Sequence, residues 1–174
     1  MVEMMISVDP ERCTGCRMCE MACSLFHHGV CGPAYSRIRI HKVEDHGFSI
    51  PVVCQHCADA PCAAVCPPRA LREDPATGAV ACDDSACVGC RLCFLVCPVG
   101  AIYFPPPGGR VKILKCDLCG GDPQCVRVCE PEALRFIRVD QAHRYRSNAL
   151  VEHYAASHGG KETDRKRGDY TVKV

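Results

Sequence analysis

The chain has 174 residues, 18 of them cysteine, no tryptophan and a formal net charge of +1 at pH 7. No apolar run approaches the roughly 20 residues that a membrane-crossing helix needs, and the first residues lack the basic segment and apolar stretch of a secretory signal. We therefore expect a soluble, cytoplasmic protein of one domain or two small ones, in which grouped cysteines bind metal instead of forming disulfides.

Sixteen of the cysteines fall into four groups of four along the chain. The first and third groups share one spacing, and Ser24 follows the first group where Pro98 follows the third. The second and fourth groups are longer between their second and third cysteines, where a loop can lengthen without moving the pair before it. The groups are Cys13, Cys16, Cys19 and Cys23; Cys54, Cys57, Cys62 and Cys66; Cys87, Cys90, Cys93 and Cys97; and Cys116, Cys119, Cys125 and Cys129.

The spacing of the third group has a mechanical reason. A tight loop eased by Gly89 can wrap three sulfurs around one face of an iron–sulfur cube, and Cys97, one helical turn beyond Cys93, carries its sulfur towards a second cube. Pro98 has no N–H to donate and closes the segment. A structural zinc site uses cysteine pairs with a longer spacer, so the pattern predicts iron. A zinc or redox-sensing module is the alternative, and colour and iron content would distinguish them.

Short segments between the groups predict antiparallel strand pairs, because they alternate or are bounded by residues typical of turns. The predicted pairs are Arg37–His41 with Phe48–Val53, Ala70–Arg72 with Ala79–Ala81, and Ala101–Phe104 with Val111–Leu114. A last strand is expected from Ala133 to Val139, since Ala133-Leu134 repeats the alanine and large aliphatic residue that follow the second and third groups.

Residues 140–158 predict a helix. Asp140 is a suitable N-cap, Gly159-Gly160 a suitable stop, and an apolar stripe runs along the segment at helical spacing: Ala142, Tyr145, Ala149, Leu150 and Tyr154. Because no grouped cysteine lies beyond residue 129, we expect this helix to dock on a catalytic subunit or on a second copy of the chain. The alternative is that it only covers the metal-binding core.

Three basic residues stand beside grouped cysteines: Arg17, Arg91 and Lys115. A cation near a cluster ligand can raise the cluster's reduction potential, but long charged side chains are mostly exposed. We expect solvated surface charge at all three positions.

The remaining cysteines and three histidines have less specific readings. Cys31 and Cys82 are expected to be small buried side chains. A metal site made of His27, His28 and Cys31 has suitable ligand types but lacks a fourth partner in the sequence. His56, between Cys54 and Cys57, is expected to shape the surroundings of the sulfurs without binding iron.

The order of the four groups, from Val8 to about Val139, resembles the four-cluster electron-transfer subunits of molybdenum and tungsten oxidoreductases. The ferredoxin-like subunits of hydrogenases and carbon monoxide dehydrogenases are similar. The run from Cys13 to Ser24 and the brief linkers look most like the small subunit of tungsten aldehyde oxidoreductases. This resemblance implies an α+β fold of tandem bacterial-ferredoxin-like repeats, related by a pseudo-two-fold axis, with four [4Fe–4S] clusters.

The resemblance also implies how the cysteines are shared. Residues 1–139 would form the polyferredoxin domain, with groups one and four in one half and groups two and three in the other, while residues 140–174 would form a docking helix and charged tail. The implied ligand sets are Cys13, Cys16, Cys19 with Cys129; Cys116, Cys119, Cys125 with Cys23; Cys54, Cys57, Cys62 with Cys97; and Cys87, Cys90, Cys93 with Cys66.

The implied function is electron transfer without a catalytic residue. The subunit would link a tungsten- or molybdenum-pterin aldehyde oxidoreductase subunit to a flavin- or NAD-type subunit or a soluble ferredoxin, in an anaerobic cell. Alternatives are a partner of hydrogenase, carbon monoxide dehydrogenase or dimethyl-sulfoxide-reductase type, or a free polyferredoxin. Sixteen thiolates against four cubes of charge near +2 make the loaded chain roughly eight units more negative than its formal charge, which argues against a nucleic-acid partner.

Overall fold

The computed structural model describes residues 4–107 and 112–142. The chain divides into one unit from Met1 to Asp140 and another from Gln141 to Val174. Nearly all of the helix predicted at residues 140–158 lies outside the described residues. The fold described below is therefore that of the first unit.

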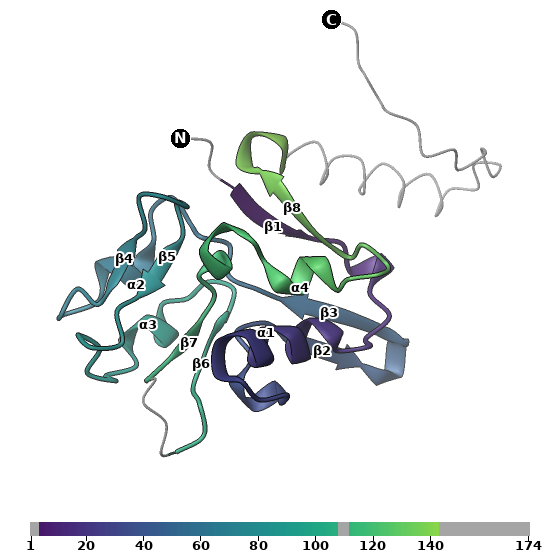
Figure 1. The fold of residues 1–174 in the computed structure, drawn as a ribbon, viewed down its shortest axis with the longest axis horizontal. Coiled ribbons are helices and arrows are strands. Elements are labelled where there is room, and N and C mark those ends of the chain that lie inside the picture. Colours follow the sequence, from purple (N-terminus) through teal and green to yellow (C-terminus); the bar gives the residue numbers. More distant parts are fainter. Residues whose placement is uncertain (1–3, 108–111, 143–174) are drawn as a thin grey trace, which may run out of the picture. The chain divides into compact units, whose positions relative to one another are not determined.

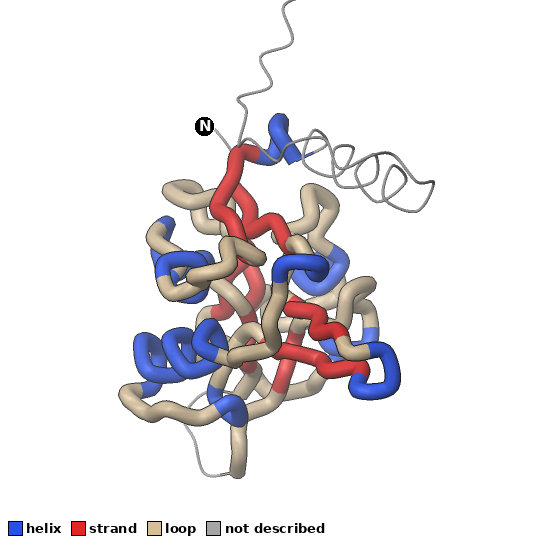
Figure 2. Tube along the Cα trace, turned by 90° about the vertical axis from the view of Figure 1, so that its right-hand side faces the viewer, coloured by secondary structure: helices blue, strands red, loops and turns tan. Residues whose placement is uncertain are grey.

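The strands form four separate antiparallel pairs, drawn in Figure 1. The pairs are β1 (Met4–Val8) with β8 (Leu134–Arg138), β2 (Arg39–Val43) with β3 (Phe48–Val52), β4 (Leu71–Glu73) with β5 (Val80–Cys82), and β6 (Ile102–Tyr103) with β7 (Leu114–Lys115). Figure 2 shows that these strands are short and that loops separate them. The three predicted pairings are confirmed.

The strand bounds differ from the predicted ones, and β1 is absent from the predicted set. Strand β7 begins at Leu114, three residues later than expected, and consists of two residues. Strand β1 pairs with β8 in a register that sets Val8 opposite Leu134. The Asp9 N–H continues this ladder by donating to the Ala133 carbonyl at 2.8 Å. The final strand therefore finds its partner at the other end of the described chain.

Each cysteine group contributes a helix that carries its third cysteine. The helices are α1 (Met18–His28), α2 (Pro61–Ala64), α3 (Leu92–Leu95) and α4 (Gln124–Arg127). After α2 and α3, Cys66 and Cys97 each precede a proline, and a residue before proline is disfavoured in helical conformation. These helices consequently last about one turn.

Helix α1 is longer because Ser24 takes the place of that proline. Ser24 is fully buried, its Oγ donates to the Met21 carbonyl at 3.0 Å, and it accepts from the Gly32 N–H at 3.0 Å. The serine thus allows the helix to continue and also ties down the loop that follows it. The helix ends at Gly29, whose left-handed φ of 68° is one that glycine adopts at low cost.

A second repeat follows the cysteines of groups two, three and four. Ala70, Ala101 and Ala133 are at most 2% exposed. The residue before each alanine has a left-handed φ: 52° at Arg69, 63° at Gly100 and 54° at Glu132. The same backbone bend therefore directs the chain into β4, β6 and β8.

The buried side chains form two clusters of apolar residues. One gathers residues of α1, α4 and β1, β2 and β8, and the other gathers residues of α2, α3 and the strands β4, β5 and β6, with Ile113 just before β7. Helix α1 packs against α4, and α2 packs against α3, so groups one and four lie together, as do groups two and three (Figure 1).

Candidate metal centres

The loop between the first two cysteines of every group contains one left-handed residue, at the position before the second cysteine. These residues are Gly15, His56, Gly89 and Leu118, with φ of 69°, 44°, 72° and 57°. At this residue the backbone changes direction between the first and second cysteines of each group. At Gly15 a Cβ would also lie 2.5 Å from the Ser49 Oγ, so that position requires glycine for space as well.

His56 and Leu118 adopt this conformation without being glycine, at a cost. Tertiary contacts hold both in place. The Nδ1 of His56 accepts the Val80 N–H at 3.0 Å, and Leu118 is fully buried. Burial, with a further contribution from Lys115, lowers the pKa of His56 to about 3, so this ring is a neutral acceptor at pH 7.

Three cavities are each lined by four grouped cysteines, three from one group and the last cysteine of another. The empty space is about 330, 280 and 340 Å³ in the three, including space open to solvent, which suits the same kind of occupant in each. The cysteines are Cys87, Cys90, Cys93 with Cys66 in the first; Cys116, Cys119, Cys125 with Cys23 in the second; and Cys54, Cys57, Cys62 with Cys97 in the third.

The fourth quartet, Cys13, Cys16, Cys19 and Cys129, is brought together at the packing of α1 on α4. Cys13 and Cys129 pack against the buried cluster that contains Cys19. Burial, together with nearby Glu20, Cys16 and Cys129, raises the pKa of Cys19 to about 12. Each of the four quartets is the one that the family resemblance implies; that they bind clusters stays a prediction.

Successive quartets are linked by pairs of thiols that belong to the same buried cluster. The Cys19 thiol helps to raise the pKa of Cys125, the Cys54 thiol that of Cys116, and the Cys62 thiol that of Cys93. Named by their first members, the quartets are therefore ordered Cys13, Cys116, Cys54 and Cys87.

The pKa values of the buried thiols distinguish a metal-binding role from a role as reactive thiols. Burial raises the pKa values of Cys116 and Cys125 strongly, and raises that of Cys119 to about 11. A reactive or redox-exchanging cysteine needs the opposite, a lowered pKa that supplies thiolate. Bound metal deprotonates its thiol ligands outright, so these buried sulfurs fit metal ligands better than nucleophiles.

Lys115 does not carry the solvated surface charge that we expected. Its residue is 3% exposed, and its Nζ donates to the Cys54 Sγ at 3.3 Å, to the Val80 carbonyl and to the Cys116 carbonyl at 3.4 Å. Two of these partners, Cys54 and Val80, are 61 and 35 positions away in the sequence, which explains why neighbouring residues gave no signal of its burial.

Arg17 and Arg91 are exposed, as expected. The Arg91 guanidinium lies over the Phe104 ring, 4.6 Å from its centroid. Arg17 lies 3.8 Å from the buried carboxylate of Glu20, whose Oε1 accepts the Ile40 N–H at 2.9 Å.

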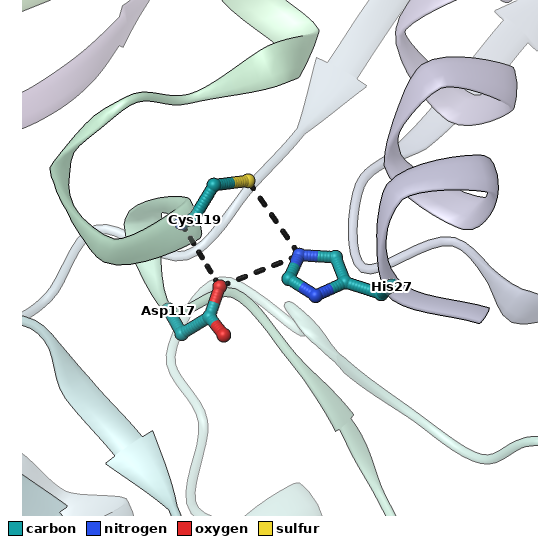
Figure 3. A group of neighbouring side chains, drawn as sticks. All are labelled: His27, Asp117 and Cys119. Carbon is teal, nitrogen blue, oxygen red and sulfur yellow. Dashed lines mark hydrogen bonds and ion pairs between the residues drawn. The ribbon is translucent and has the colours of Figure 1, made fainter. Parts of the chain in front are cut away.

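A cluster of three metal-ligating types lies beside the second cavity (Figure 3). The His27 Nε2 is 3.4 Å from the Asp117 Oδ1 and 3.5 Å from the Cys119 Sγ. Arg37 pairs with the other Asp117 oxygen at 2.6 Å. Burial, with a further contribution from Arg37, lowers the pKa of His27 to about 4, so the ring is neutral at pH 7 and can donate one N–H.

The expectations for the remaining cysteines are corrected. Cys31 is exposed, not buried, because it lies in the loop that follows α1. Among residues 4–107 and 112–142, the only trio whose ligand atoms all lie within 4.8 Å of one another is that of Figure 3, so His27, His28 and Cys31 form no such group. Cys82 is half-buried and joins the wall of the first cavity.

As expected, His56 lies among the sulfurs of the third cavity, which it contacts through its backbone; that it does not bind iron stays a prediction. Its N–H donates to the Cys54 Sγ at 3.4 Å. The same sulfur thus accepts from both His56 and Lys115.

For the part of the chain that the structure describes, no helix has the length and apolar character needed to cross a membrane.

Two families of iron–sulfur proteins match the chain. Residues 46–139 match the 4Fe-4S dicluster domain family, and residues 5–30 match a 4Fe-4S binding domain. Together the two matches cover all four cysteine groups.

Several relatives are similar over most of their length. The chain is 40% identical over 147 residues to the aliphatic sulfonate oxidoreductase, polyferredoxin-like subunit, of Pyrococcus furiosus, with 83% of each chain covered. It is 36% identical over 149 residues to the putative electron transport protein YsaA of Escherichia coli, covering 81% of this chain and 94% of the relative. It is 35% identical over 147 residues to the thiosulfate reductase electron transfer subunit PhsB of Salmonella typhi, covering 77% and 75%.

Proposed function

This chain belongs to the 4Fe-4S dicluster family of iron–sulfur proteins, and from that premise we propose that it relays electrons through four [4Fe–4S] clusters as the non-catalytic subunit of an oxidoreductase complex. Two of its relatives are named as polyferredoxin-like or electron transfer subunits, and a third as a putative electron transport protein. The observation that carries the proposal is the lining of three cavities by three cysteines of one group and the last cysteine of another.

The ligand sets we propose are the four quartets. The donor chemistry fits the group, since four thiolates are the usual ligands of a [4Fe–4S] cluster. One-electron transfer is the chemistry that such clusters supply when bound. The two halves would be tandem ferredoxin-like repeats, with residues 1–139 as the cluster domain and residues 140–174 as a docking segment.

The protein's own part is to hold the clusters in order and to set their surroundings. The three thiol pairs between successive quartets support a single linear path. Buried aliphatic side chains such as Ile6, Ile102 and Leu114 keep water away from the interior. Hydrogen bonds to ligand sulfurs, as at Cys54, adjust the potentials.

The two end quartets each contain an exposed cysteine, and the middle quartets contain none. Cys16 is exposed in the quartet that begins with Cys13, and Cys90 is exposed in the quartet that begins with Cys87. We infer that electrons enter at one of these ends and leave at the other. Each end would then face a different redox partner.

The catalytic partner we propose is a tungsten- or molybdenum-pterin subunit, of aldehyde oxidoreductase type, in the cytoplasm. The second partner would be a flavin- or NAD-type subunit or a soluble ferredoxin. A sulfonate oxidoreductase is the second candidate for the catalytic subunit. It is favoured by the 40% identity to the Pyrococcus furiosus polyferredoxin-like subunit.

Anaerobic purification tests the proposal directly. The protein should be brown and contain about 16 iron and 16 acid-labile sulfide atoms per chain, four cubes' worth. Stoichiometric zinc without visible absorbance would overturn it. Identifying the large subunit that co-purifies from the native cell, and its metal, would then separate the aldehyde from the sulfonate candidate.

A further inference from the structure

We propose that the buried Lys115 ammonium is the counter-ion of the cluster held by Cys54, Cys57, Cys62 and Cys97, and that it raises the reduction potential of that cluster. The proposal deepens the proposed function and rests on it. According to the proposal, Lys115 makes the Cys54 cluster, an inner cluster of the relay, easier to reduce.

The position of Lys115 requires an anion that the protein itself does not provide. The residue is 3% exposed. Among the ion pairs formed by residues 4–107 and 112–142, none includes Lys115. A buried ammonium without an anion is strongly unfavourable. Its one sulfur contact is the Cys54 Sγ, at 3.3 Å, which is a thiolate when it holds iron.

The contacts of the ammonium favour one cluster over its neighbour. Towards the third cavity, Nζ reaches the ligand sulfur of Cys54 and the ammonium lines the cavity wall. Towards the second cavity, it contacts only the backbone carbonyl of Cys116, at 3.4 Å. The electrostatic effect should therefore be greatest on the cluster bound by Cys54.

Simple electrostatics gives the sign of the effect. Reduction adds one negative charge to the cluster, and a fixed positive charge beside a ligand stabilises the more negative state. The interaction is stronger in the low dielectric of the interior than at the surface. The other donor to Cys54, the His56 N–H at 3.4 Å, is a neutral group. Of the two groups that donate to the Cys54 sulfur, Lys115 is therefore the charged one.

Two neutral substitutions and one control separate charge from structure. Lys115→Met removes the charge and the hydrogen bonds, whereas Lys115→Gln removes the charge and retains a polar end. Lys112→Met removes a charge at an exposed site near Gly89. Each full-length holoprotein is purified anaerobically, its iron is counted, and its clusters are titrated with reductant while electron paramagnetic resonance is recorded. Cys97→Ser identifies the signal of the Cys54 cluster.

The expected result is a fall in the potential of that one signal in both Lys115 variants, with about 16 iron atoms retained. The equilibrium constant for its reduction should fall at least tenfold, equivalent to about 59 mV for one electron. Lys112→Met should leave the signal of the Cys54 cluster unchanged.

Two results would overturn the proposal. If both Lys115 variants keep their iron and every signal keeps its potential, the ammonium does not tune the cluster. If both variants lose the cluster, the lysine has a structural role only. A wild-type chain without iron would instead refute the proposed function, so the two failures are distinguishable.

Discussion

The His27 Nε2 lies 3.5 Å from the Cys119 Sγ, although the two residues are 92 positions apart in the chain. The contact exists because α1 continues for five residues beyond Cys23, from Ser24 to His28. Arg37 fixes the other side of the arrangement through its 2.6 Å pair with Asp117. Because Ser24 stands where a proline follows the second and third groups, the helix extends far enough for His27 to line the second cavity.

Replacing Ser24 by proline should shorten α1 and detach His27 from Cys119. Proline in a helix interior removes a backbone hydrogen bond and clashes with the preceding turn, which costs about 3 kcal/mol or more. We expect the visible cluster absorbance of the variant to bleach at a lower temperature than that of the wild type. Circular dichroism should show less helix.

Ser24→Ala is the matched control, because it keeps the helix and removes only the hydroxyl. It leaves the partly buried Gly32 N–H without its acceptor, which costs at most the roughly 1–3 kcal/mol of a fully buried group. The bleaching temperature should fall less than in Ser24→Pro. An equal fall in both variants would show that the hydroxyl, not the helix length, is what matters.

Cys97→Ser should damage the cluster held by Cys54, Cys57 and Cys62, and leave the cluster of its own group intact. The reason is that Cys97 lines the third cavity, while Cys87, Cys90 and Cys93 line the first. Iron should fall from about 16 towards about 12 atoms per chain, or one signal should change its spectrum. A Cys66→Ser variant should affect the other cluster of this half. Damage to the reverse cluster in each variant would refute the pairing.

Cys82 tests whether the fifth thiol of the first cavity is a ligand. Burial, together with the nearby Cys87, raises its pKa to about 12. A cube needs only four thiolates, and Cys82 belongs to none of the four groups. We expect Cys82→Ala to keep about 16 iron atoms and Cys87→Ala to lose about four. If Cys82→Ala loses iron and Cys87→Ala does not, the ligand assignment at this cavity is wrong.

Removing iron should unfold the described unit. Five of the 13 buried residues in its larger core cluster are cysteines, so an ordinary apolar core is small and metal binding is coupled to folding. An iron chelator under reducing, anaerobic conditions should abolish both the visible absorbance and the protection of backbone amides from hydrogen exchange. Protection that survives complete iron loss would contradict this expectation.

A chain ending at Val139 should retain its clusters and lose a partner. All sixteen grouped cysteines lie at or before Cys129, and β8 ends at Arg138. We expect about 16 iron atoms and an unchanged absorbance spectrum, together with loss of binding to the catalytic subunit or of self-association. A truncated chain that assembles normally but loses iron would show that the residues after 139 only cover the cluster core.

The cysteine groups and the strand pairs between them could be predicted from the sequence, because both depend on local patterns. The alternation in Arg37–His41 anticipated β2, and the alanine and aliphatic pair at 133–134 anticipated the start of β8. The partner of β8 could not be found in this way. Strand β1 is only five residues long, and its pairing closes a loop across nearly the whole described unit.

Burial of single side chains was the other limit. From the neighbouring sequence, a charged lysine is expected to be exposed to solvent. Lys115 is buried because acceptors from Val80, Cys54 and Cys116 surround its ammonium. Cys31 fails in the opposite direction, because a cysteine is usually buried but here lies in an exposed loop. Both errors concern tertiary packing, which no local pattern contains.

The pairing of β1 with β8 encloses one half of the unit within the other along the sequence. The half with groups two and three is synthesised after group one and before group four. The cysteines that line the first and third cavities all lie between Cys54 and Cys97, so this inner half is fully made while the ribosome has yet to reach Cys116. The outer half cannot close until Cys129 and β8 have emerged, since its sheet joins the two ends of the unit. Domains fold as units during synthesis. We therefore expect maturation of the nascent chain to run from the inside outwards, so that an interrupted translation product would contain one complete half.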